Sequence, residues 1–122
     1  MFKVKEGIKI NASTFVDASR NVSAGSVSLT GLQTSVATKT SGYTATVNDS
    51  LLLVDASSGD VTITLPNATT CAGQLYTIKK TDSSTNAVII AASSSQTIDG
   101  ASTSEITKQW GSTLVQSSGT SW

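Results

Sequence analysis

Residues 61–65, VTITL, alternate strictly between apolar and polar side chains. Such alternation is typical of a β-strand with one buried face, because successive strand side chains point to opposite sides. We expect Val61, Ile63 and Leu65 to face the core, and Pro66 to end the strand. The segment therefore restricts the chain to folds that cover one face of a β-sheet.

Other short segments also read as strands separated by turns. The apolar run LLLVD at 51–55 is followed by ASSGD, whose glycine and aspartates suit a turn, so we expect a hairpin between 51–55 and 61–65. QLYTIKK at 74–80 reads as a strand whose inward face the alternation leaves open. AVIIAA at 87–92 is too short for a helix and rich in β-branched residues, which favours a central strand.

The series of short strands continues through Ile98, Ile106 and the STLVQ segment at 112–116. Serine and threonine account for 40 of the 122 residues and glutamate for only two. This bias disfavours helix, because threonine loses rotamer freedom there and serine competes for backbone hydrogen bonds. We expect an all-β fold, and the turn spacing is typical of a sandwich or a small barrel.

Residues 1–40 have a different character from the rest. FKVKEGIKI can form a small hairpin, but the thirty or so residues that follow hold few large apolar side chains. Such a stretch buries too little area to offset its ordering entropy. We interpret 1–40 as an extended N-terminal arm that becomes ordered on a partner surface or on copies of itself, and 41–122 as the folded domain. The large apolar side chains of the arm are the candidate attachment residues: Phe2, Val4, Ile8, Ile10, Phe15 and Val16.

Charge and composition argue against several classes of protein. The formal net charge is zero, and the charges are scattered singly, so nothing marks a nucleic-acid or anionic-membrane surface. No apolar run approaches the roughly 20 residues that span a bilayer, and the charged N-terminus does not resemble a signal peptide. One cysteine and no histidine argue against an intrachain disulfide and a zinc site. We expect synthesis in a reducing cytoplasm.

The sequence offers little for catalysis, and we expect neither an enzyme nor a cofactor. Nearly all the aspartates fall in expected turns, where they bond the backbone. A calcium site between Asp55 and Asp60 is an alternative, although their spacing matches no known calcium loop. Cys71 has no histidine to activate it and is interpreted as a small buried or loop thiol. Lys79 and Lys80 would face opposite sides of a solvated strand end.

Four aromatic residues in the expected domain admit two interpretations. Trp110, Trp122, Tyr43 and Tyr76 are its large rings. Such rings usually pack in a core or a subunit interface, but an exposed one can stack on a sugar. Trp110 and Tyr76 are therefore the candidate glycan contacts.

Longer stretches of the chain resemble a known kind of module. DASSGDVTITLPNA at 55–68, the run from GQLYTIKK to SQTIDG at 73–100, and STLVQSSGTSW at 112–122 resemble a module of tailed-bacteriophage virion proteins. That module occurs in the distal parts of tail fibres and tailspikes and in some capsid decoration, or cement, proteins. Residues 2–25 also look like a connector stretch of phage fibre chains.

The resemblance implies a β-sandwich, antiparallel and jelly-roll-like, that assembles as a homotrimer on the outside of a virion. We expect a decoration protein whose N-terminal arm binds the major capsid protein and reinforces the shell, with host adhesion as an added role. The alternative is a tail-fibre or tailspike tip that recognises a host cell-surface glycan.

Overall fold

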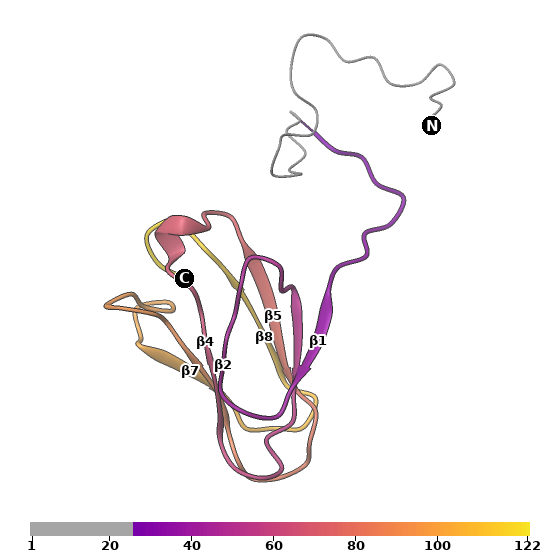
Figure 1. Ribbon diagram of the computed structural model, residues 1–122, viewed down its shortest axis with the longest axis vertical. Helices are drawn as coiled ribbons and strands as arrows, with labels where there is room; N and C mark the ends of the chain where they lie inside the picture. Colours follow the sequence, from indigo (N-terminus) through magenta and orange to yellow (C-terminus); the bar gives the residue numbers. More distant parts are fainter. Residues whose placement is uncertain (1–25) are drawn as a thin grey trace. The chain divides into compact units, whose positions relative to one another are not determined.

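Two four-stranded β-sheets make up the part of the chain that the computed structural model describes, residues 26–122 (Figure 1). The only helical element in this part is a 3₁₀ turn, Ala68–Thr70, where the Asn67 side chain accepts from the Thr69 N–H. The predicted all-β class is confirmed.

Each sheet draws on alternate parts of the sequence. One sheet has the order β1-β3-β5-β8, formed by Val36–Lys39, Leu51–Val54, Leu75–Lys80 and Ser112–Gln116. The other has the order β2-β4-β6-β7, formed by Tyr43–Thr44, Val61–Thr64, Val88–Ala91 and Thr103–Ile106. Figure 1 shows β2, β4 and β7 on one side of the unit and β1, β5 and β8 on the other.

The chain from β1 to β6 winds as a coil, because each strand lies in the opposite sheet from the one before it. Strands that become neighbours in this way are parallel: β1 with β3, β3 with β5, β2 with β4, and β4 with β6. Strand β7 then pairs antiparallel with β6, and β8 pairs antiparallel with β5, so that each forms an edge strand of its sheet. The sheets are therefore mixed, and the predicted antiparallel arrangement is wrong for most of the pairs.

The predicted hairpin between 51–55 and 61–65 is also wrong. Strands β3 and β4 are both present, but they lie in different sheets, and the loop between them crosses from one sheet to the other. A strand with one apolar face buries that face equally well whether the next strand is its hairpin partner or lies in the facing sheet. Alternation in the sequence therefore cannot distinguish the two connections.

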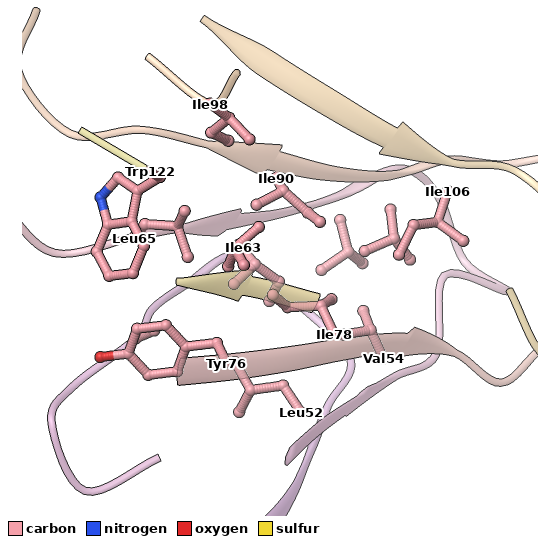
Figure 2. Close-up of a cluster of buried hydrophobic side chains, with 14 of the residues drawn as sticks. Leu52, Val54, Ile63, Leu65, Tyr76, Ile78, Ile90, Ile98, Ile106 and Trp122 are labelled. Atoms are coloured by element: carbon pink, nitrogen blue, oxygen red, sulfur yellow. The ribbon is translucent and has the colours of Figure 1, made fainter. Parts of the chain in front are cut away.

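A single apolar core fills the space between the sheets. Figure 2 shows Leu52 and Ile78 from one sheet pointing toward Ile63 and Ile90 from the other. The expectation that Val61, Ile63 and Leu65 face inward is confirmed, since all three are buried. Burial of this kind contributes roughly 25 cal/mol per Å² of apolar surface, and it is the main force that holds the sheets together.

Several local predictions are confirmed. β6 lies inside its sheet, as expected for a central strand, and β8 coincides with the predicted strand at 112–116. Ile106 ends β7, while Ile98 forms only an isolated bridge with Ala101. The inward face of β5, which the sequence left open, carries Tyr76, Ile78 and Lys80.

The folded domain begins earlier than predicted. The unit that holds all the described strands runs from Gln33 to Trp122, and β1 lies wholly before the expected boundary at residue 41. Ala37 of β1 packs against the core, which explains why this stretch of small and polar residues can fold. All six candidate attachment residues, Phe2 to Val16, lie outside the described residues.

Candidate functional site

The loop that follows β5 packs directly on the loop that follows β3. The Ala56 N–H donates to Asp82 Oδ2 over 2.7 Å, and Asn86 Nδ2 donates to the Ala56 carbonyl over 2.7 Å. The Ala87 N–H donates to Asp60 Oδ1 over 2.7 Å. These bonds join two successive turns of the coil, so the polar residues of the loops hold the stack in register.

A buried ion pair lies beneath these loops. Lys80 is fully buried, and its Nζ is 2.5 Å from Asp82 Oδ1 and 3.3 Å from Ser84 Oγ. The predicted solvated position of Lys80 is therefore wrong, because the strand turns this side chain toward the core. Burial favours a raised pKa for Asp82, but the hydrogen bonds from Lys80, Ser84 and Ala56 outweigh it and hold that pKa well below its ordinary value.

The other described aspartates with side-chain partners bond the backbone, as predicted for turns. Asp55 Oδ1 accepts from the Ser57 N–H over 2.9 Å. Asp49 Oδ2 accepts from the Thr46 N–H over 2.8 Å and from the Tyr43 hydroxyl over 2.9 Å. Burial again opposes ionisation of Asp49, yet these hydrogen bonds leave its pKa below the ordinary value.

The structure gives no support to the calcium alternative. The loop bonds already described engage one oxygen each of Asp55 and Asp60. Among residues 26–122, no three His, Cys, Asp or Glu side chains lie close enough together to hold a metal ion. The Cys71 thiol is buried, with Sγ 3.5 Å from the Asn67 carbonyl oxygen, in agreement with its interpretation as a small buried thiol.

Tyr76 lies in the core, which makes it unsuitable as a glycan contact. Its ring centroid is 5.5 Å from that of Trp122, and its hydroxyl donates to the Thr46 carbonyl over 2.8 Å. Figure 2 shows both rings at the same end of the core. Trp122 Nε1 donates to the Pro66 carbonyl over 3.1 Å, so the end of the chain is tied into the core. Burial raises the pKa of Tyr76 to about 12.

Trp110, the other candidate glycan contact, is 61% exposed. It has a φ of 64°, in the left-handed region that a bulky residue rarely adopts. Its N–H donates to the Lys80 carbonyl over 2.9 Å, and Lys79 Nζ lies 5.6 Å from its ring centroid. The backbone of Trp110 is therefore bonded to β5, while its ring lies at the surface and buries little area.

A shallow depression of about 250 Å³ lies between β7 and β8. Its lining includes one carboxylate, Glu105, and one ammonium group, Lys108. Acid and base catalysis needs two titratable groups whose environments separate their pKa values, and this lining offers a single carboxylate without histidine. The depression therefore gives no basis for assigning a reaction.

The outward side of the β1-β3-β5-β8 sheet carries a row of side chains that we call the outer row. Its members are paired in register, one from each strand: Val36, Leu51, Thr77 and Leu114. Neighbouring strands lie about 4.8 Å apart, so the four side chains form one continuous line. Val36 is 60% exposed and Leu114 67%.

Neither the outer row nor the buried ion pair was predicted from the sequence. Alternation could have indicated only the part of this surface on β3, because Leu51 and Leu53 point away from the core when Leu52 and Val54 point into it. Nothing in the sequence showed that Lys80 is turned inward, since the adjacent Lys79 fits either face equally well.

Comparisons with known proteins leave the family open. The sequence matches no protein-family model, and neither a curated protein nor a solved structure is significantly similar to it. In the described part of the chain, no helix has the length and apolar character that crossing a membrane requires.

Proposed function

We propose that this chain is a structural protein of a tailed-bacteriophage virion, acting as a homotrimeric decoration protein on the outer surface of the capsid. The proposal starts from the resemblance of residues 55–68 and 73–100 to phage virion modules. One structural observation carries it further. Two polar side chains of the loop after β5, Asp82 and Asn86, bond the backbone of Ala56 in the loop after β3.

In this proposal the β-sheet unit is a rigid scaffold, and the N-terminal arm attaches it to the major capsid protein. The attachment residues are the apolar side chains of the arm, Phe2, Val4, Ile8, Ile10, Phe15 and Val16. A capsid repeats its surface many times, and a trimer offers three arms. Individually weak contacts then give firm attachment through effective concentration.

The first test is the abundance of this protein in purified virions, measured by quantitative mass spectrometry. A decoration protein is expected at a copy number comparable to that of the major capsid protein. If the protein is missing from the virions, the proposed function is wrong.

The second test measures binding to shells of the phage that encodes the chain. A variant that has serine at all six attachment positions keeps the arm's length, and it should remain folded but lose shell binding. A matched control replaces six of the arm's own serine, asparagine and alanine residues with glycine and should bind as the original chain does. Shell binding by the serine variant would contradict attachment through these side chains.

A tail-fibre or tailspike tip that binds a host glycan is the second candidate, and the exposed ring of Trp110 favours it. Tryptophan faces stack on sugar rings, and Trp110 combines an exposed ring with a φ of 64°, a costly backbone conformation of the kind found at functional sites. A glycan array with Trp110→Ala as the control tests this role. Low copy number together with Trp110-dependent glycan binding would favour the fibre over the decoration protein.

A further inference from the structure

The two sheets of the folded unit differ in what they present to solvent. The outer row contributes Val36, Leu51 and Leu114 to one sheet. Leu53 follows Leu51 by two residues and lies on the same side of β3. Leu75 precedes Thr77 by two residues and lies on the same side of β5. This outward side is therefore rich in large aliphatic side chains, although the structure buries few of them.

The outward side of the β2-β4-β6-β7 sheet is mostly polar. Val61 and Ile63 point inward on β4, so Thr62 and Thr64 point outward. By the same register, Glu105 pairs with Ile89 on the outward side. Among the described strand residues of this sheet, Ile89 is the one large aliphatic side chain that faces out. The aliphatic surface thus belongs to one sheet and is not a general property of the fold.

Trp110 adds an aromatic ring beside the aliphatic side. It is connected to that side by Lys79, which points outward from β5 and whose ammonium group lies near the ring. The left-handed backbone of Trp110 is energetically unfavourable for a residue other than glycine. Because the ring is exposed, folding recovers little of that cost, as expected for a side chain placed to meet a partner.

We propose that the outward side of the β1-β3-β5-β8 sheet, with Trp110 as an anchor, is the surface through which copies of this chain assemble. The inference rests on the proposed function, which supplies the expectation of a homotrimer. It adds the face, the residues and the character of the contact.

The charges favour a second copy as the partner. Among its described strand residues this side carries a single charged group, Lys79, and no acidic one. A strongly charged partner would find almost nothing to pair with, whereas an identical face matches aliphatic side chains with aliphatic side chains. The formal net charge of zero also means that copies do not repel each other.

The size of the face indicates how strong the contact is. Four strands about 4.8 Å apart and five residues at about 3.3 Å each give a flat footprint of roughly 300 Å². A stable interface buries about 800 Å² per partner, so this face alone gives a weak contact.

Sedimentation of the full chain over a range of concentrations tests the proposal. Leu114→Asp places a charge in the outer row on an edge strand, β8. Its matched control is Thr103→Asp, which places the same charge on the other sheet's edge strand, β7. Both positions are exposed, so both variants should fold, which thermal melting verifies. Leu114→Asp should weaken assembly about tenfold or more, whereas Thr103→Asp should leave it unchanged.

Trp110→Asn provides an independent variant, because asparagine tolerates the left-handed backbone. It should also weaken assembly. A chain that is a monomer at every concentration overturns the proposal, as does a Leu114→Asp variant that assembles as tightly as the original chain.

The face has one other plausible occupant, the virion shell. A monomer that binds shells and loses that binding with Leu114→Asp would assign the face to the shell and overturn self-association. These results are separable from the proposed function. Absence of the protein from virions contradicts that function without changing the sedimentation result, whereas unaltered assembly of Leu114→Asp contradicts only the face.

Discussion

The Lys80 ammonium group lies 2.5 Å from Asp82 Oδ1, and both side chains are nearly or fully removed from solvent. The same carboxylate accepts the Ala56 N–H from the loop after β3. The ion pair therefore links two turns of the coil and leaves neither charge unpartnered. Removing one partner of a buried pair is costly, because the remaining charge stays out of water without compensation.

A double-mutant cycle tests whether this pair acts as a unit. Lys80→Met and Asp82→Asn should each lower the free energy of unfolding in urea, and the double variant should lose clearly less than the sum of the two. Lys79→Met is the matched control, because its side chain points outward. Its effect should stay within about 0.5 kcal/mol, as for most surface substitutions. Additive losses in the cycle would show that the two charges do not interact.

Acid should destabilise the protein through Asp82. The fold holds the pKa of this carboxyl below its ordinary value of 3.8, so folding favours the ionised form. The resulting stabilisation is present above about pH 3.8 and is lost as the pH falls below that value toward the pKa of the folded state. Melting temperatures measured from about pH 7 to about pH 2 should fall less steeply for Asp82→Asn than for the original chain. Parallel curves would contradict this assignment.

Most of the strands could be placed from the sequence, although β1 and β2 could not, and the pairing of the strands could not be predicted. The alternation of VTITL placed Val61, Ile63 and Leu65 in the core, and β8 was predicted within its observed bounds. Pairing depends on the loops, and the six residues at 55–60 suit a hairpin as well as a crossing between sheets. The deciding contacts come from residues some 26 to 30 positions later, Asp82 to Ala56 and Asn86 to Ala56.

The candidate site residues show the same limit. An exposed ring and a buried ring look alike in a sequence, and only the register of β5 places Tyr76 inside, against Trp122. Trp110 was predicted as a contact residue, and its exposure keeps it available for that role. The outer row could not be predicted as one surface, because its members come from four separate strands that only the fold brings together.

Removing the hydroxyl of Tyr76 should lower stability at neutral pH and reduce the loss of stability at alkaline pH. Tyr76→Phe loses the hydrogen bond to the Thr46 carbonyl, which should cost about 1 kcal/mol at neutral pH. The raised pKa of about 12 means that folding favours the neutral phenol. That stabilisation is present below pH 10.0 and is lost as the pH rises from there toward about 12.

Urea unfolding of Tyr76→Phe at several alkaline pH values checks this expectation. The variant should lose stability less steeply than the original chain over that range. If both lose stability equally as the pH rises, Tyr76 is not the group responsible.

Gly111 allows the close approach between the end of β7 and the start of β8. A Cβ at this position would lie 2.8 Å from Ile106 Cγ2 and 3.0 Å from the Lys108 carbonyl oxygen. The backbone on either side is fixed, since the Lys80 N–H donates to the Gly111 carbonyl and the Gly111 N–H to the Lys108 carbonyl. Gly111→Ala should therefore lower the free energy of unfolding in urea by about 1–3 kcal/mol, as overpacking does elsewhere.

Gly31→Ala is the control, because a Cβ there meets nothing within 4 Å. Equal stabilities of the two variants would mean that the β7–β8 connection relaxes freely. In that case Trp110, which directly precedes Gly111, would not be held in place by this contact.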